Sequence, residues 1–182
     1  IAVTGMTDVK KKCINELGYG KNAKMFAGFK NRYWRRQGAT GQTFSDMPFQ
    51  LGWDNSQLQP GTAAGYTFYT GGVMTDKMKD LPVEQKVREY IGQLDKIFPG
   101  AAKNYTGVNG IFYWPTQPFT LASYACYKVG QWTTVRGAEA EPVGNIFFAG
   151  EHCSADFQGY MNGGAKTGRV AAENLLAVLK KK

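Results

Sequence analysis

A carboxylate and a glycine-rich loop stand close together near the C-terminal end of the sequence. Glu151 follows the run 145–150, in which residues 146–149 are apolar, and Gly159-Tyr160-Met161 comes eight residues later. A carboxylate fixed at the end of a strand can accept hydrogen bonds from sugar or polyol hydroxyls. Glycines let the backbone approach a ligand closely, and the N-terminus of a following helix offers unpaired N–H groups to an electron-rich ligand. This spacing predicts half of a nucleotide-binding site.

Two elements are needed to position that carboxylate. Four consecutive apolar residues, 146–149, predict a buried strand covered on both faces. Beyond the loop, small and apolar residues recur at helical spacing and predict a helix that the glycines open. These residues are Ala165, Gly168, Ala172, Leu175, Leu176 and Leu179. Glu151 would then lie on the loop between strand and helix.

The rest of the sequence alternates between predicted helices, strands and irregular structure. Strands are expected over 23–29, 66–70 and 106–114, and helices over 7–17 and 83–98. Gly18-Tyr19-Gly20 matches part of a phosphate-binding pattern, but it connects a helix to a strand, so we expect a helix cap and a tight turn there. Residues 40–65, rich in glycine, predict irregular structure around a short segment at 49–54.

The C-terminal motif resembles that of a known family. The run Asn-Ile-Phe-Phe-Ala-Gly-Glu-His at 145–152, the later Gly-Tyr-Met and the Thr-Gly-Arg at 167–169 closely resemble the C-terminal flavin motif of the FAD-dependent amine oxidases. Upstream, Trp114 and Tyr124 stand ten residues apart, which is similar to the family's segment beside the flavin. The chain resembles the bacterial monoamine-oxidase-like members in particular, over almost its whole length.

This resemblance implies an α/β fold made of parts of two domains. Residues 1–115 would be part of an α+β substrate-binding domain with a mixed sheet. Residues 116–182 would be the C-terminal strand and helix of an FAD-binding, Rossmann-like domain, whose N-terminal dinucleotide-binding part is absent from the chain. We therefore expect the C-terminal half of an amine oxidase, as a fragment or processed subunit that is inactive alone, rather than a standalone domain.

The resemblance also implies the chemistry. The family transfers a hydride equivalent from an amine to FAD, O2 reoxidises the flavin to give H2O2, and the imine hydrolyses to an aldehyde or a keto acid. Tyr124 and Tyr160 would flank the substrate. The residues expected to contact FAD are Trp114, Gly150, Glu151, Gly159, Tyr160 and Met161. The alternative is a non-catalytic, flavin-oxidase-like module or processed subunit used for binding or assembly.

Two departures from the family pattern matter. Where monoamine oxidases carry a cysteine bonded to the flavin, this sequence has Ser123, so the FAD is expected to be non-covalent. The segment that bears the family's flavin-proximal lysine would lie upstream of Ile1. Lys10, Lys11 and Lys12 are predicted to form a solvated helix face, and Lys24 to be a strand residue.

Composition excludes several other classes of function. His152 is the single histidine and the three cysteines lack metal-ligand spacing, so no metal site is expected. The net charge of +8 comes from dispersed lysines and arginines, which does not indicate nucleic-acid binding, and no apolar stretch is long enough for a membrane span. Lysines 180–182 are best explained as a helix C-terminus.

The expected partners are a small-molecule amine, O2 and the missing N-terminal half of the same protein. A homodimer stays open, as does the choice between cytoplasm and periplasm. The identity of the amine cannot be derived from these residues.

Overall fold

The computed structural model describes residues 3–180, so the predicted lysine-rich end at 180–182 lies mostly outside the described residues. The chain forms two compact units. The sheet unit spans Lys21–Ser123, and the split unit joins the residues up to Gly20 with those from Tyr124 onward. The expected division at residue 115 concerns the domains of a longer protein and stays a prediction.

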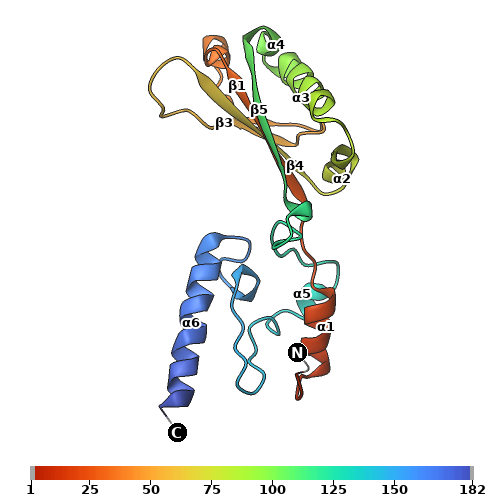
Figure 1. The fold of residues 1–182 in the computed structure, drawn as a ribbon, viewed down its shortest axis with the longest axis vertical. Coiled ribbons are helices and arrows are strands. Elements are labelled where there is room, and N and C mark those ends of the chain that lie inside the picture. The colour runs from red at the N-terminus through yellow and green to blue at the C-terminus, as the bar shows by residue number, and fades with distance from the viewer. Residues whose placement is uncertain (1–2, 181–182) are drawn as a thin grey trace. The chain divides into compact units, whose positions relative to one another are not determined.

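The sheet unit is built on one five-stranded sheet with the order β2-β3-β4-β1-β5 (Figure 1). Its strands are β1 (Asn22–Phe29), β2 (Thr43–Phe44), β3 (Leu51–Asp54), β4 (Ala64–Gly71) and β5 (Tyr105–Tyr113). The predicted strands and the α/β class are confirmed. The pairings of these strands are antiparallel, however, where a mixed sheet was expected. The reason is that β1 lies between β4 and β5, which share a direction but are not neighbours.

Three helices connect β4 to β5 along one face of the sheet (Figure 1). They are α2 (Val73–Lys79), α3 (Val83–Ile97) and α4 (Ala101–Asn104). The prediction of α3 is confirmed, since its residues at helical spacing, Val87, Tyr90, Ile91 and Leu94, are all buried. The helix α2 could not be predicted from the sequence, because a helix of two turns that buries only Thr75 and Met78 carries a weak periodic signal.

Aromatic side chains fill the core between these helices and the sheet. Trp34, on the 3-10 helix Tyr33–Gln37, is fully buried and packs against Tyr66 at a ring distance of 5.4 Å. Phe49 packs edge-on against Phe68 at 5.0 Å, and both are fully buried. Large rings dominate the stability of such a core, because each removes much apolar surface from water.

The opposite face of the sheet carries a second set of rings that stay accessible. Side chains alternate along a strand, so Phe26 points away from the core that its neighbours Met25 and Ala27 enter. Phe26 is 42% exposed and Phe112 on β5 is 38% exposed. Trp53 on β3 shares this face by register, since it and Phe26 both pair with Thr67 of β4. The sheet unit therefore has one packed face and one open aromatic face.

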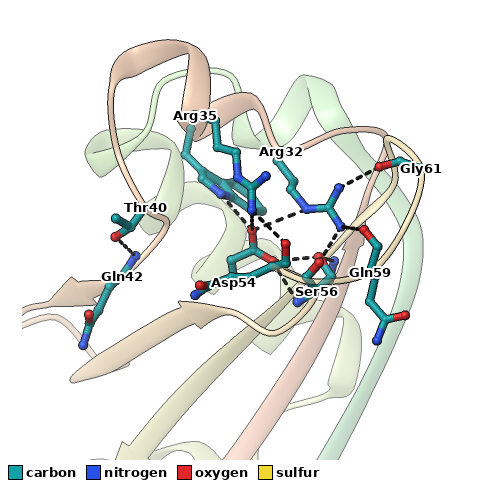
Figure 2. A network of polar contacts seen from close by, with 11 residues as sticks. Arg32, Arg35, Thr40, Gln42, Asp54, Ser56, Gln59 and Gly61 are labelled. Carbon is teal, nitrogen blue, oxygen red and sulfur yellow. Dashed lines mark hydrogen bonds and ion pairs between the residues drawn. The ribbon is translucent and has the colours of Figure 1, made fainter.

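A buried carboxylate organises the irregular residues 55–63 (Figure 2). Asp54 is 2% exposed and accepts hydrogen bonds from the backbone N–H and the hydroxyl of Ser56, at 2.8 and 2.7 Å. Its other oxygen lies 3.6 Å from the Nε of Arg32 and 3.8 Å from a guanidinium nitrogen of Arg35. Arg32 also donates to the carbonyl oxygen of Gly61, at 2.8 Å. The ion pairs and hydrogen bonds around Asp54 thus hold residues 55–63 in place, although these residues form no helix or strand.

The split unit contains helices α1 (Asp8–Glu16), α5 (Gln131–Thr134) and α6 (Met161–Leu179). The hydroxyl of Thr7 caps α1 by accepting the N–H of Lys10 at 3.1 Å, so the predicted capped helix is confirmed. Gly18, after α1, lies against backbone: a side chain there would collide with the carbonyl oxygen of Cys126. The Gly18–Gly20 segment connects α1 to β1, as predicted, but the predicted helix cap and tight turn are wrong. Leu17 is the C-cap residue, neither glycine has a positive φ, and Tyr19 forms an antiparallel bridge with Ala125, so the segment is extended.

The predicted strand at 145–149 is wrong. Val143 and Ile146 form an isolated bridge, and no strand within residues 3–180 pairs with the run. Ile146 is 38% exposed, and Phe147 and Phe148 are only partly buried. An extended segment becomes a strand only by pairing, since its N–H and C=O groups point sideways toward neighbours. The apolar pattern was present, but the described chain offers no partner for it.

The helix that follows the glycines, α6, is confirmed, yet its apolar residues are largely exposed. Leu175, Leu176 and Leu179 are 43%, 55% and 56% exposed, and only Gly163 of the helix is buried. In the described part of the chain no helix is long and apolar enough to cross a membrane.

Candidate functional site

Glu151 stands at the centre of the expected site, on the 3-10 turn Glu151–Cys153 of the split unit. One carboxylate oxygen accepts the backbone N–H of Ala125 at 2.8 Å, and the other accepts that of Gly159 at 2.6 Å. Each oxygen has a second lone pair, so the carboxylate keeps acceptor capacity for a ligand hydroxyl. Glu151 therefore joins three separate loop segments and is half-buried among them.

The loop before Glu151 is fastened to α6 through Thr167. The N–H of Gly150 donates to the Thr167 hydroxyl at 3.0 Å, and that hydroxyl lies 2.8 Å from the Gly150 carbonyl oxygen. A side chain at Gly150 would collide with the ring of His152, and one at Gly163 would collide with the carbonyl oxygen of Phe157. These glycines permit the close approach of loop and helix that the sequence analysis expected. Thr167 belonged to the C-terminal motif, but no role was predicted for it from the sequence.

The start of α6 is open. Tyr160 is the N-cap residue and makes no side-chain capping bond, and Gly159 before it has a φ of +84°. Tyr160 is 70% exposed and Met161 is 92% exposed. The first N–H groups of a helix lack the partners that the later ones have, and they carry the positive end of the helix dipole. Here the third, that of Gly163, donates to the carbonyl oxygen of Tyr160 at 2.9 Å, and those of Met161 and Asn162 come before it. This end of α6 can receive an electron-rich group.

Tyr124 lies beside the same turn. A side-chain carbon placed on Gly159 would be 3.8 Å from the Tyr124 ring, and the residue after Tyr124 donates to Glu151. Tyr124 is 39% exposed. The structure thus brings Tyr124, Gly150, Glu151, Gly159, Tyr160 and Met161 together in the split unit.

Trp114 belongs to the sheet unit, on the 3-10 turn Trp114–Thr116. Its ring lies 4.5 Å from that of Phe112, so it extends the open aromatic face of the sheet. Its position relative to Glu151 stays a prediction.

The thiol of Cys153, on the same turn as Glu151, is not prepared to act as a nucleophile. Burial raises the pKa of the Cys153 thiol to about 11, so this thiol stays protonated at neutral pH. Within residues 3–180 no three His, Cys, Asp or Glu residues are grouped so as to hold a metal ion. The site consists of hydrogen-bond acceptors, open N–H groups and aromatic rings, which suits binding and orientation rather than covalent catalysis.

The chain was compared with known families, proteins and structures. Residues 4–176 match the family of flavin containing amine oxidoreductases. Polyamine oxidase 5 of Oryza sativa is 28% identical over 93% of this chain, which spans 34% of that protein. A putative flavin-containing monoamine oxidase of Mycobacterium tuberculosis is 27% identical over 88% of this chain and 35% of its own length. The chain thus spans about a third of the length of these relatives.

Solved structures of flavin amine oxidases have the same fold as this chain. Cyclohexylamine oxidase from Brevibacterium oxydans superposes with a TM-score of 0.85 over 96% of this chain and 39% of that one, at 22% identity. Putrescine oxidase bound to putrescine superposes with a TM-score of 0.75, at 22% identity. With a family match over nearly all of its residues, the chain belongs to the flavin-containing amine oxidoreductases.

Proposed function

We propose that this chain is part of an FAD-dependent oxidase that converts an amine to an imine, with release of H2O2. The observation that carries the proposal is the position of the Glu151 carboxylate beside the open start of α6, held there by the N–H groups of Ala125 and Gly159. A fixed carboxylate next to unpaired N–H groups suits a ligand that has both hydroxyls and electron-rich ring atoms.

FAD is such a ligand, and the residues present fit it. Glu151 would accept a hydroxyl of the ribityl chain, and the exposed backbone of Met161 would donate its N–H to the pyrimidine edge of the flavin. Gly159 permits the turn because its positive φ disfavours other residues. With Ser123 at the position of the family's bonded cysteine, the FAD would be held without a covalent bond. When bound, it would supply the hydride acceptor that this chemistry needs.

The amine would meet aromatic surfaces. Tyr124 and Tyr160, both next to Gly159, would orient the substrate nitrogen by contact with their faces. A substrate with an apolar body and a neutral amine at one end fits these two rings. In the sheet unit Phe49 and Asp54 are buried and serve the core instead. The hydrolysed product would be an aldehyde or a keto acid.

The remaining two thirds of the protein would complete the site. We propose that it supplies the glycine-rich turn for the FAD pyrophosphate and covers the exposed leucines of α6. It would also give residues 145–149 the neighbouring strand that they lack.

A second function deserves a test, because both oxygens of Glu151 already bind backbone N–H groups. That arrangement alone also suits a module without catalysis, in which Glu151 only ties loops together.

The deciding experiment uses the purified protein that contains this chain. After dialysis, its flavin content is read from the visible spectrum, and H2O2 release from a panel of amines is followed with a coupled peroxidase assay. Retained flavin together with amine-dependent H2O2 supports the oxidase. Retained flavin without H2O2 from any amine supports a module that binds flavin without catalysis. A protein that does not take up FAD contradicts the oxidase and supports a module in which Glu151 only ties loops together.

A further inference from the structure

The structure contradicts one expectation in a way that points to a new role. Lys10 was predicted to lie on a solvated helix face with Lys11 and Lys12. Those two are exposed, but Lys10 is only 1% exposed, the most buried charged residue of its helix. Placing an ammonium group in a protein interior is costly unless its donors are satisfied. The position of Lys10 therefore needs an explanation.

Backbone oxygens, not a carboxylate, satisfy the Lys10 ammonium. Its Nζ donates to the carbonyl oxygen of Ala138 at 2.7 Å and to that of Glu139 at 2.8 Å. It also lies 3.5 Å from the centre of the Phe148 ring, a cation–π contact. Among the described residues no carboxylate lies within ion-pair distance of it. Lys10 thus binds a turn and a ring, rather than a counter-ion.

The segments that Lys10 joins are those that flank the Glu151 loop. Phe148 lies two residues before Gly150. On the other side, the thiol of Cys153 lies two residues after Glu151 and donates to the same Glu139 carbonyl oxygen at 3.3 Å. The ammonium is therefore in contact with the entry to the loop and, through one carbonyl oxygen, with its exit.

The 137–139 turn is itself well fixed. The side chain of Glu139 is 5% exposed, accepts the N–H of Gly137 at 2.6 Å and accepts the hydroxyl of Tyr127. Because this turn is fixed, the contacts that Lys10 of α1 makes with it and with Phe148 restrain both ends of the loop that carries Glu151. In turn, the loop determines whether Glu151 can reach the N–H groups of Ala125 and Gly159.

We propose that Lys10 is a positioning residue that holds the Glu151 loop in the geometry required to bind FAD. It acts through Phe148 and the Glu139 carbonyl oxygen and does not touch the cofactor. The inference rests on the proposed function for its FAD-dependent part, while the ordering of the loop can be measured without FAD.

The test compares three forms of the protein that contains this chain: wild type, Lys10→Met and Lys12→Met. Methionine keeps the length and apolar character of the lysine stem but cannot donate to the two carbonyl oxygens. Lys12 is exposed on the same helix and serves as the control. Hydrogen exchange of the apoprotein is followed by mass spectrometry in peptides that cover Ala125 and Gly159, and FAD affinity is measured by titration of the apoprotein.

We expect Lys10→Met to raise exchange in both peptides and to weaken FAD binding about tenfold or more, a loss of about 1.4 kcal/mol, with Lys12→Met like wild type. The visible circular dichroism of the flavin that still binds should change, which a general loss of stability would not cause. Wild-type exchange and affinity in a folded Lys10→Met protein would overturn the proposal. If Lys10→Met does not fold, Phe148→Leu serves instead and should weaken FAD binding about threefold, whereas unchanged binding and exchange would overturn it.

The two proposals fail in different ways. If wild type takes up no FAD, the proposed function is wrong, and the exchange data still decide whether Lys10 orders the loop. If wild type binds FAD and Lys10→Met binds it equally well, only the role of Lys10 is wrong.

Discussion

The two units of this chain bury their apolar residues to very different degrees. The sheet unit closes a core of its own, in which Trp34, Tyr66 and Phe68 are fully buried. The split unit leaves Leu176 and Leu179 on α6 more than half exposed, and its second buried cluster is small, centred on Cys13, Val135 and Ala138. One unit therefore packs its apolar side chains into a closed core, whereas the unit that carries Glu151 leaves large apolar side chains exposed.

Removing a core ring should affect the sheet unit most. Trp34→Ala deletes a fully buried indole that contacts Phe29, Tyr33, Tyr66 and Phe98, so it should lower the free energy of unfolding by about 3–5 kcal/mol. Trp132→Ala in the split unit, where the side chain is 56% exposed, should cost about 1 kcal/mol or less. Urea titrations followed by circular dichroism measure both, and equal losses would remove the contrast between the units.

The buried ion pair should come next. Asp54→Asn keeps the shape of the side chain but leaves the Arg32 guanidinium, 8% exposed, without its carboxylate. The expected loss is about 3 kcal/mol, because an uncompensated buried charge is costly. Asp8→Asn, whose carboxylate is 98% exposed, is the matched control and should change stability little. A loss as small as that of the control would mean that the 55–63 loop is held by other contacts.

Glu151→Gln tests the split unit at its site. The amide keeps one acceptor oxygen but loses the charge, so the bond to Ala125 or Gly159 weakens together with any bond to a flavin hydroxyl. FAD affinity should fall by about 1–3 kcal/mol, measured by titration of the apoprotein. Glu173→Gln on the exposed side of α6 is the control. Unchanged flavin content after dialysis would refute the role of Glu151 in binding.

A substitution on the exposed face of α6 should change stability less, and by an amount that differs between the isolated chain and the whole protein. Leu176→Ala should change the stability of the isolated chain by less than about 0.5 kcal/mol, because the side chain is 55% exposed. In the whole protein it should cost about 1.5 kcal/mol if the remaining part covers this face. The two values are compared by thermal unfolding, and equal small losses in both proteins would show that α6 stays uncovered.

The pH dependence of Lys10 should give the smallest effect. Burial lowers the pKa of its ammonium, against the opposing influence of Cys13, Cys153, Glu141 and Glu139. Between that lowered pKa and the usual 10.5 of a lysine, the unfolded chain binds more protons than the folded one, so this group makes stability rise with pH. The stability of wild type relative to Lys10→Met should therefore increase toward pH 10.5. A constant difference in urea titrations across this interval would contradict the burial of a titrating lysine.

The sequence predicted elements whose pattern depends on their own residues. The 3.6-residue periodicity of 83–98 and the aromatic content of 66–70 were sufficient for α3 and β4. The prediction of a strand at 145–149 was wrong because a strand needs a neighbouring strand to pair with, and no local sequence pattern reveals whether one is present. The prediction that Lys10 is solvated was wrong for a similar reason. Three consecutive lysines look alike in sequence, and only the tertiary contact with Ala138 and Glu139 distinguishes the first.

The candidate site was predictable to the extent that a motif fixes it. Gly150, Glu151 and Gly159 were predicted from the C-terminal motif, and the structure brings them together through the Glu151 carboxylate and the Gly159 N–H. Their contact with FAD stays a prediction. Thr167, which bonds to Gly150 from the second turn of α6, had no separate signal, since a threonine in a helix is common.

We propose that the site formed around Glu151 and the start of α6 serves amine oxidation by FAD. The most direct measurement is the visible spectrum of the protein that contains this chain, recorded anaerobically before and after addition of an amine substrate. We expect a flavin spectrum that the amine bleaches and that O2 restores. A protein that binds no FAD, or whose flavin spectrum no amine changes, would contradict it.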